Sequence, residues 1–405
     1  MTPDDVAWLE TPEGDAAARH ASDLLAAGTG ELRTIDALRR DHPAERARAA
    51  LALAIGRRSA AAKFHDAHRL FFDRESAEQA SSEHVARHTA ARFAGQVRVA
   101  DLGCGAGGDL VALAAEARVV AVDRDPTRLA MARANARVRG LSDRTAFVEA
   151  DLSVADTTAC SVAWLDPARR DPGGRVLDPH RWSPALASAI EVARRFEGAG
   201  IKLAPGIERE LLPSDGELEF ISLGGALVGA ILWLGALARD PRTATVLSAG
   251  GVAHELRGDP DHAPRAIGAP QTVGATGEPG AYLYDPDPAV GRAELVRSLA
   301  AHLGAWQLDA RLAYLTADEA VATPFARRFR ILAALPFAER RLLEELRSLD
   351  AARVEVMRRG SPIDPGELAK RLDARLHGSR VLTVALARVG TRQFAIVCER
   401  ERDAV

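Results

Sequence analysis

Glycines cluster between two aspartates in residues 99–109, which read Val-Ala-Asp-Leu-Gly-Cys-Gly-Ala-Gly-Gly-Asp. The apolar start predicts a short buried strand, and the glycines predict a turn whose backbone N–H groups can approach a ligand closely. The next predicted strand, 118–122, leads into Asp123, about 20 residues past the first glycine, where a carboxylate can accept both hydroxyls of a ribose. The pattern indicates a nucleotide-like cofactor at the end of a parallel sheet.

The charge of this turn selects among such cofactors. The glycine spacing also fits the dinucleotide fingerprint, but Asp101 and Asp109 place two negative charges at the pocket. These carboxylates would repel a diphosphate and attract a cation that carries a sulfonium and an ammonium group. S-Adenosylmethionine is that ligand, and a nicotinamide oxidoreductase is the alternative that the carboxylates disfavour.

Four short motifs in order resemble class I S-adenosylmethionine-dependent methyltransferases. Residues 101–108 look like motif I, and Val-Asp-Arg-Asp-Pro (122–126) resembles the ribose-binding strand end. Glu-Ala-Asp (149–151) resembles the acidic end of the third strand, which meets the adenine amino group, and Trp-Leu-Asp-Pro (164–167) resembles the substrate-facing motif IV. The resemblance implies a doubly wound Rossmann-like sheet. It also implies a set of cofactor-binding residues: Asp101, Gly103, Gly105, Gly107, Asp109, Asp123, Arg124 and Asp151.

Asp166 and Pro167 are the candidate catalytic residues. Asp166 follows a predicted buried strand, 161–165, and ligands of open α/β sheets bind at the carboxyl ends of the strands. An acceptor there can hold an exocyclic amino group in position for methyl transfer, and Pro167 removes a backbone donor from the turn. The alternative is that Asp166 caps this turn, since Asp-Pro often starts turns.

The residues after Pro167 depart from the pattern of methyltransferases that act on base amino groups, which have a second proline and then an aromatic residue. Here Ala168 and Arg169 stand at those positions. Arg169 and Arg170 can bind phosphate or stack on a base. Trp182 is a candidate stacking platform, with a buried core tryptophan as the alternative. These three residues are therefore candidates for substrate binding.

A segment upstream of the glycine turn resembles the one that leads into motif I in trimethylguanosine synthase-like methyltransferases. It comprises Lys-Phe (63–64), Leu-Phe-Phe-Asp (70–73) and Gln-Ala-Ser-Ser-Glu-His-Val-Ala (79–86). In that group the segment folds over the cofactor. The Trp-Gly-Gly that binds the cap there is absent here, so the resemblance implies the architecture and not the cap substrate. Lys63 and Gln79 become candidate lid residues, with a helix surface as the alternative.

The order of the predicted elements divides the chain into four parts. Residues 1–95 have apolar positions at three- and four-residue intervals, which predicts a helical domain. Strands and helices then alternate over 96–255, which predicts an α/β, doubly wound methyltransferase sheet. Residues 256–280 are rich in Gly, Pro and Asp and predict a linker or long loop. Residues 281–405 predict helices, among them one over 289–303, followed by a small α+β domain that resembles a THUMP-like RNA-binding domain.

The charge of the C-terminal part suggests what this part binds. Residues 324–400 contain 16 Lys and Arg against nine Asp and Glu, whereas the whole chain has a net charge of -3. A basic lobe beside an acidic catalytic domain suits the phosphate backbone of RNA, with a solvated surface as the alternative. Arg358 and Arg359, which precede a Gly-Ser-Pro turn, are the candidate contacts.

Cysteine usage and hydropathy indicate the compartment. The three cysteines, Cys104, Cys160 and Cys398, have neither a disulfide framework nor metal-ligand spacing, which predicts a reducing cytosol and no metal site. The uncharged run 220–238 is long enough to cross a membrane, but its glycines divide it into strand-length pieces and favour buried strands. We expect a cytoplasmic protein with no membrane span.

The leading hypothesis is an S-adenosylmethionine-dependent methyltransferase that acts on a base in RNA. One alternative is a methyltransferase for a small molecule, which the basic C-terminal lobe disfavours. Another is a cofactor-binding RNA-binding protein without catalysis, which the altered residues after Pro167 keep open.

Overall fold

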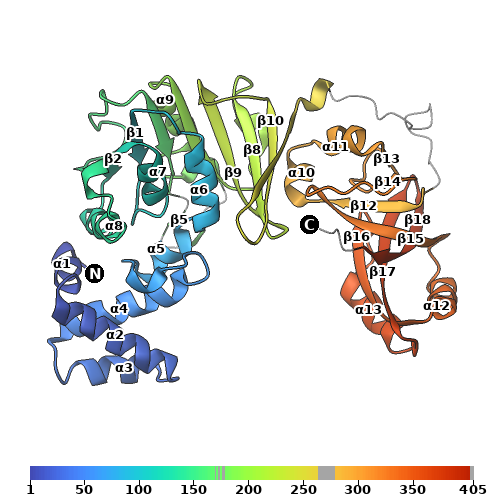
Figure 1. Cartoon of the computed structure of the whole chain (residues 1–405), viewed down its shortest axis with the longest axis horizontal. Helices are drawn as coiled ribbons and strands as arrows, with labels where there is room; N and C mark the ends of the chain where they lie inside the picture. The colour runs from blue at the N-terminus through green and yellow to red at the C-terminus, as the bar shows by residue number, and fades with distance from the viewer. Residues whose placement is uncertain (169, 172–173, 176–177, 263–278, 402–405) are drawn as a thin grey trace. The chain divides into compact units, whose positions relative to one another are not determined.

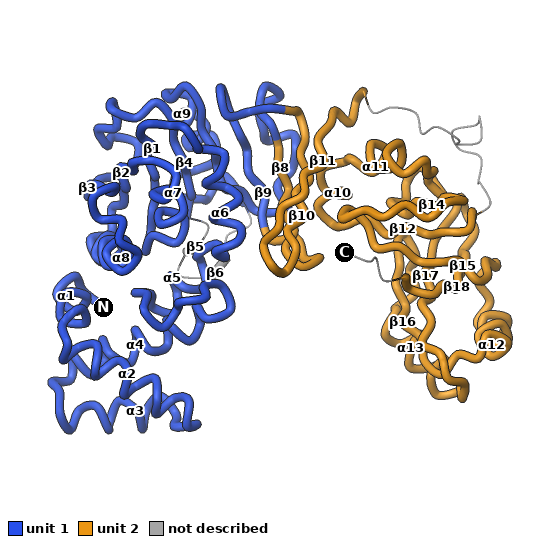
Figure 2. Tube along the Cα trace, viewed as in Figure 1, with its two compact units in different colours: residues 1–217, 229–239 blue, residues 218–228, 240–405 orange. Residues whose placement is uncertain are grey.

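The computed structural model describes residues 1–168, 170–171, 174–175, 178–262 and 279–401. The chain forms two compact units, of which the first contains residues 1–217 and 229–239 and the second contains 218–228 and 240–405 (Figure 2). Most of the predicted linker 256–280 lies outside the described residues. The predicted domain limits at residues 95, 255 and 280 stay a prediction.

Residues 1–95 are helical, as the spacing of their apolar residues predicts. The α-helices are α1 (Pro3–Leu9), α2 (Pro12–Ala26), α3 (Glu31–Leu38), α4 (Ala44–Ala60), α5 (Arg74–Gln79) and α6 (Glu83–Ala91), with a 3₁₀ turn at Ala67–Arg69. Side-chain oxygens of residues before the helices bind the free N–H groups of the first turns, as Thr11 does for α2 and Ser82 for α6.

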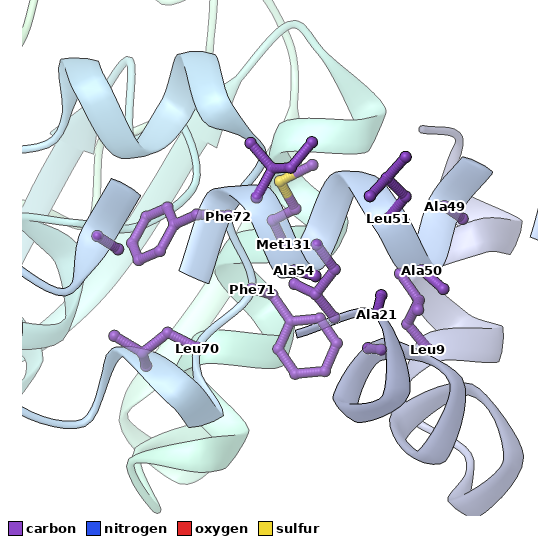
Figure 3. Close-up of a cluster of buried hydrophobic side chains, with 14 of the residues drawn as sticks. Leu9, Ala21, Ala49, Ala50, Leu51, Ala54, Leu70, Phe71, Phe72 and Met131 are labelled. Atoms are coloured by element: carbon purple, nitrogen blue, oxygen red, sulfur yellow. The ribbon is translucent and has the colours of Figure 1, made fainter. Parts of the chain in front are cut away.

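The N-terminal helices share a hydrophobic core with the helix that follows the second strand of the sheet. Leu9, Leu51, Phe71 and Phe72 are buried in one cluster with Met131, which belongs to α8 (Pro126–Val138). Figure 3 shows Met131 among the side chains of these helices. The shared core fixes the segment around Phe71 against the sheet, next to the glycine turn.

The first unit contains a mostly parallel sheet with the predicted doubly wound connections (Figure 1). Its strands are β1 (Arg98–Leu102), β2 (Arg118–Asp123), β3 (Thr145–Glu149), β4 (Val162–Leu165), β7 (Gly198–Leu203) and β9 (Ala226–Gly235), and its further helices are α7 (Leu110–Glu116) and α9 (Leu186–Ala193). The strand order is β3-β2-β1-β4-β7-β9, and each pair is parallel except β7 with β9. The fold-class prediction is therefore confirmed.

Large aromatic side chains fill the core of this sheet. Trp164 and Trp233 are buried with their ring centroids 6.0 Å apart. Gly200 makes room for them, because a Cβ there would lie 2.5 Å from the ring of Trp233. Arg92 and Glu217 form a buried ion pair, with Nη1 of Arg92 2.8 Å from Oε2 of Glu217. The packing of Trp164 and Trp233 at Gly200 holds β4 and β7 together, and the ends of these two strands position the site described below.

Two predicted helices differ from the structure. The helix expected over 289–303 is two helices, α10 (Pro288–Arg292) and α11 (Val296–Leu303), because Glu294 adopts a left-handed conformation with φ 62° between them. The alternation of strands and helices also predicts a helix over 183–197, but α9 spans Leu186–Ala193, since Ser183 pairs with Ala168 in a β-bridge.

The uncharged run 220–238 forms extended strands, as predicted. It supplies most of β8 (Glu217–Leu223) and β9. In the described part of the chain, no helix has the length and apolar character needed to cross a membrane.

The second unit contains two groups of strands. In the first group, β10 (Arg242–Leu247) pairs parallel with β8 and antiparallel with β11 (Ala253–Gly258). The second group is a sheet of order β13-β14-β12-β15-β18-β17-β16. Its elements are β12 (Tyr282–Pro286), β13 (Trp306–Gln307), β14 (Leu315–Ala317), β15 (Ala326–Pro336), α12 (Glu339–Ser348), β16 (Ala351–Arg359), α13 (Pro365–Asp373), β17 (Arg380–Val389) and β18 (Arg392–Arg400). Strands β16 and β17 are parallel and joined by α13, so this sheet combines strands and helices as predicted for the small α+β domain.

Candidate active site

The glycine turn follows β1 and depends on backbone conformations that glycine adopts readily. Gly103, Gly105 and Gly107 have φ values of 84°, 53° and 85°. A Cβ at Gly103 would lie 3.0 Å from the backbone oxygen of Asp166, whereas a Cβ at Gly105 would meet nothing within 4 Å. The backbone N–H of Gly105 donates to Oδ2 of Asp123 at 2.8 Å. The turn therefore packs closely against the end of β4 at Gly103 and is open at Gly105.

Asp101 is a buried acidic group next to this turn. Its side chain is 1% exposed, and its Oδ2 atom has no hydrogen-bond partner among the described residues. Burial raises the pKa of Asp101 well above its usual range, and the negative charges of Asp109, Asp166 and Asp123 raise it further. A buried, unsatisfied carboxyl beside an open turn fits a cationic ligand such as the ammonium group of S-adenosylmethionine.

Asp166, at the carboxyl end of β4, is bound to a lysine that the sequence analysis missed. Oδ2 of Asp166 lies 2.7 Å from Nζ of Lys202, and the same Nζ lies 3.2 Å from Oδ2 of Asp109. The backbone N–H of Asp166 donates to the carbonyl of Leu102 at 3.2 Å, which joins its turn to β1. Lys202 is a lone charge in the apolar strand β7, and that contrast was the available signal for it.

The remaining predicted cofactor residues lie at the ends of the neighbouring strands. Asp123 ends β2, and Arg124 follows it on the surface. Asp151 lies beyond β3, where its Oδ1 accepts hydrogen bonds from the backbone and side chain of Ser153, which lower the pKa of Asp151. Asp101, Asp109, Asp123 and Asp166 are thus close enough to interact electrostatically, whereas Arg124 and Asp151 are exposed beside them.

The two candidate lid residues make contacts within residues 63–86, the N-terminal segment that leads into the glycine turn. Nζ of Lys63 donates to the carbonyls of Ala77, Glu78 and Ala80 at 2.9, 2.7 and 2.7 Å, which caps the end of α5. Gln79 is exposed and donates from Nε2 to Glu75 at 2.9 Å. Lys63 therefore holds the segment in place. Ala80, whose carbonyl Lys63 binds, lies against the glycine turn: a Cβ at Gly108 would be 3.0 Å from the Cβ of Ala80.

Asn135 joins the N-terminal segment to the glycine turn and was also missed by the sequence analysis. Its Oδ1 atom accepts from the backbone N–H of Phe71 at 2.7 Å. Its Nδ2 atom donates to the carbonyls of Phe71 at 3.0 Å and Ala106 at 2.8 Å. The Asn135 side chain is buried in α8, so these bonds form away from water.

The substrate-binding candidates after motif IV are only partly described. Pro167 is buried, and Trp182 is 4% exposed, so the tryptophan fits its alternative, a core residue, and not an open stacking platform. Arg169 lies outside the described residues. Arg170 begins the short strand β5 (Arg170–Asp171), which pairs antiparallel with β6 (Gly174–Arg175).

The predicted RNA contacts in the second unit, Arg358 and Arg359, have different environments. Arg359 donates from Nε to Oδ1 of Asp285 at 2.9 Å and from Nη2 to the carbonyl of Pro286 at 2.8 Å. Its partner Asp285 is 7% exposed and also pairs with Arg327, so Arg359 shares a buried carboxylate with a second arginine and does not project freely. Arg358 is exposed and donates to the carbonyl of Ile363. Neighbouring residues of a strand point to opposite faces, which explains the difference.

Comparisons with known proteins identify parts of the chain. The family described as "Methyltransferase domain" matches residues 99–163, and the one described as "THUMP domain-like" matches residues 326–400. A domain of unknown function, DUF8688, matches residues 2–60. The first two matches agree with the predicted methyltransferase and THUMP-like parts of the chain.

Relatives match most of the chain's length. Two proteins of Mycobacterium tuberculosis, both described as uncharacterized S-adenosylmethionine-dependent methyltransferases, are 40% identical over 349 residues, with 82% of this chain and 89% of each relative covered. A crystal structure from Porphyromonas gingivalis, described as that of a methyltransferase, matches with a TM-score of 0.76 and 19% identity, covers 96% of this chain and 98% of that one, and supports the fold. By its likeness to the mycobacterial proteins along most of their length, this chain belongs to the family of S-adenosylmethionine-dependent methyltransferases.

Proposed function

We propose that this enzyme methylates a base in RNA and that Asp166 accepts a hydrogen bond from the amino group that receives the methyl. The observation that carries the proposal is the place of Asp166 at the end of β4, beside the glycine turn that follows β1. In open α/β sheets this edge is where ligands bind. The bound cofactor supplies the sulfonium methyl group as the electrophile.

The chain's own residues bind and orient the reactants. The open backbone at Gly105 and the carboxylate of Asp123 would hold the ribose end of the cofactor, and the buried carboxyl of Asp101 would face its ammonium group. Asp166 would align the amino nitrogen in line with the methyl group, and its carboxylate oxygens would hold the proton that this nitrogen loses. Of the four predicted motifs, motif IV is thus the one assigned to the substrate.

The second unit supports RNA as the substrate. Its sheet contains the segment that matches the THUMP-like family, and residues 324–400 carry the excess of basic residues. Phosphate binding by such a lobe would be independent of sequence and would position the RNA for the first unit. A small-molecule substrate would leave this basic lobe without a role.

We also propose that the segment upstream of the glycine turn folds over the cofactor, as in trimethylguanosine synthase-like enzymes. This proposal is supported by the contact of Ala80 with the glycine turn and by the bonds of Asn135 that tie Phe71 to the same turn. The cap substrate is not proposed.

The test is methyl transfer from labelled cofactor to total RNA by the full chain, followed by mass spectrometry of the nucleosides. We expect a methylated base, and Asp166→Ala should lower the rate by about 10²–10³-fold while affinity for S-adenosylhomocysteine changes less than about threefold. Asp156→Asn, at an exposed turn residue, is the control. A labelled small molecule with unlabelled RNA, or a wild-type protein that binds cofactor and labels nothing, would contradict the proposal.

A further inference from the structure

Lys202 lies where the cofactor side and the substrate side of the site meet. Its side chain is 13% exposed, and its two carboxylate partners are 11% exposed for Asp109 and 28% exposed for Asp166. Asp109 precedes α7 at the end of the glycine turn, and Asp166 ends β4. One ammonium group therefore joins two elements that the sequence analysis assigned separately to cofactor and substrate.

We propose that Lys202 is a positioning residue of the methyl-transfer site. It fixes the carboxylate of Asp166 relative to the glycine turn, and its positive charge opposes the negative charge of the acidic cluster, which comprises Asp101, Asp109, Asp123 and Asp166. This inference rests on the proposed function of Asp166. Lys202 itself touches no reacting atom in the proposal. It acts on the substrate through Asp166 and on the cofactor through Asp109.

The register of the sheet places Lys202 beside Asp166. Strands β4 and β7 are parallel, and Leu165 pairs with Ile201. Asp166 directly follows Leu165 at the end of β4, and Lys202 directly follows Ile201 within β7, so the two residues are level with each other at the same edge of the sheet. The contact between them therefore depends on the pairing of two buried strands and not on a mobile loop.

Electrostatics gives the lysine a second effect. The carboxyl of Asp101 experiences the negative charges of Asp109, Asp166 and Asp123, and Lys202 is the cation that lowers its pKa against them. Without Lys202 the cluster would be more negative and its carboxylates would repel one another more strongly. The ratio of the affinity for S-adenosylmethionine to the affinity for S-adenosylhomocysteine, which lacks the sulfonium charge, would then rise.

The choice of lysine is informative because the chain almost always uses arginine. Only Lys63, Lys202 and Lys370 are lysines among 53 basic residues. A guanidinium group favours one carboxylate in a planar, two-point contact, whereas an ammonium group is a compact charge with three donors that can serve acceptors from different elements. Lys63 binds three carbonyls in this way, and Lys202 binds two carboxylates.

The experiment compares Lys202→Met with Lys202→Arg and with the control Arg118→Met, all in the full chain. Arg118 is an exposed residue at the start of β2, at the end of that strand away from Asp123. Calorimetry measures the affinities for S-adenosylmethionine, which carries one more positive charge, and for S-adenosylhomocysteine. In Lys202→Met we expect the affinity for S-adenosylmethionine relative to S-adenosylhomocysteine to rise by about three- to thirtyfold, as removal of one nearby charge implies.

Kinetics supplies the second readout. Lys202→Met should lower kcat by about 10–100-fold with less than about a threefold change in the KM for RNA, and Lys202→Arg should recover part of kcat and restore the affinity ratio. Arg118→Met should change neither the affinity ratio nor kcat. An unchanged affinity ratio together with an unchanged kcat would overturn the proposal.

Folding and substrate failures give separate results. If Lys202→Met does not fold, Lys202→Gln serves the same comparison, and failure of both neutral variants beside a folded Lys202→Arg would overturn the positioning role in favour of a structural one. If the wild-type enzyme methylates no RNA, the proposed function fails. The affinity ratio would still decide whether Lys202 opposes the charge of the cluster.

Discussion

The side-chain amide of Asn135 forms hydrogen bonds with both backbone groups of Phe71. Oδ1 accepts from the N–H at 2.7 Å and Nδ2 donates to the carbonyl at 3.0 Å, so the amide pairs with Phe71 as a neighbouring strand would. The same Nδ2 reaches the carbonyl of Ala106 in the glycine turn at 2.8 Å. One buried side chain thus connects the N-terminal segment, helix α8 and the glycine turn.

Replacing Asn135 should therefore weaken both stability and cofactor binding. In Asn135→Ala the buried N–H and carbonyl of Phe71 and the carbonyl of Ala106 lose this partner, which should lower the free energy of unfolding by about 2–4 kcal/mol. Denaturant unfolding measures this change, and calorimetry with S-adenosylhomocysteine measures the effect on the turn. Arg133→Ala is the control: this exposed residue of the same helix lies over the ring of Phe147, and its loss should lower the free energy of unfolding by about 1 kcal/mol or less. Equal stability of Asn135→Ala and wild type would show that water replaces the amide.

Asp123 is expected to contribute to cofactor affinity in two ways. It accepts from the N–H of Gly105 at 2.8 Å and from that of Asp125 at 3.0 Å, so it shapes the turn besides its proposed bonds to the ribose. Asp123→Ala should weaken binding of S-adenosylhomocysteine by about 1.5–3 kcal/mol, and Asp123→Asn, which keeps an acceptor oxygen, by less. Asp125→Ala removes the cap of α8 and should lower stability more than affinity. Unchanged affinity in folded Asp123→Ala would remove Asp123 from the cofactor site.

The fold was predictable from the sequence because its signals are local. Strands β1, β2 and β4 are short runs of mostly apolar residues, and the turn between β1 and α7 contains four glycines in six residues, 103–108. The acidic residues at the strand ends follow from the same motifs. The single helix expected over 289–303 was wrong because one residue, Glu294, interrupts a run whose apolar spacing continues on both sides.

The missed residues depend on contacts between distant parts of the chain. Asn135 and Phe71 are 64 residues apart, and Lys202 is 36 residues from Asp166 and 93 from Asp109. No local pattern marks such pairs. The sequence also left the role of Trp182 open. A tryptophan close to motif IV looks the same in the sequence whether its ring is buried or exposed, and here the ring is buried.

Glu83 should make the stability of the N-terminal segment depend on pH. Although burial alone would raise its pKa, the hydrogen bonds from His65 and the charges of Arg87 and Arg139 lower the pKa of Glu83 to about 2. A carboxylate whose pKa is depressed in the folded state stabilises the protein above its unfolded pKa, and this stabilisation is lost as the pH falls toward the folded pKa. The loss should therefore occur between about pH 4.5 and about pH 2, and should amount to at most about 3 kcal/mol.

Thermal unfolding of wild type and Glu83→Gln over this range measures the effect. The difference in Tm should be constant above about pH 5 and should shrink below about pH 4.5, because the wild-type carboxylate becomes protonated. Glu116→Gln, at an exposed residue of α7, is the control and should show no such trend. A constant difference down to about pH 3 would contradict the low pKa.

The basic residues of the second unit should divide into structural and RNA-binding ones. Arg359 and Arg327 both pair with the buried Asp285, one on each carboxylate oxygen. Arg359→Met leaves Arg327 in place and removes one charge-assisted hydrogen bond to Asp285, so it should lower the stability of this unit by about 1.5–3 kcal/mol. Arg388 and Arg392 flank the turn between β17 and β18, are exposed, and form no ion pair with a described acidic residue. They are the better candidates for contacts with phosphates.

Reversing the charge of Arg388 and Arg392 together tests this division. If each neutralises one phosphate of a single strand, the double Arg→Glu variant should bind RNA more weakly, and its slope of log affinity against log salt should be shallower by about 1.4. Its melting temperature and its affinity for S-adenosylhomocysteine should match wild type, since neither residue makes a buried contact. Filter binding between about 50 and 200 mM salt gives the slopes. A double variant with the wild-type slope would place the RNA contacts elsewhere, and a flat salt profile of the wild type itself would remove this lobe from RNA binding.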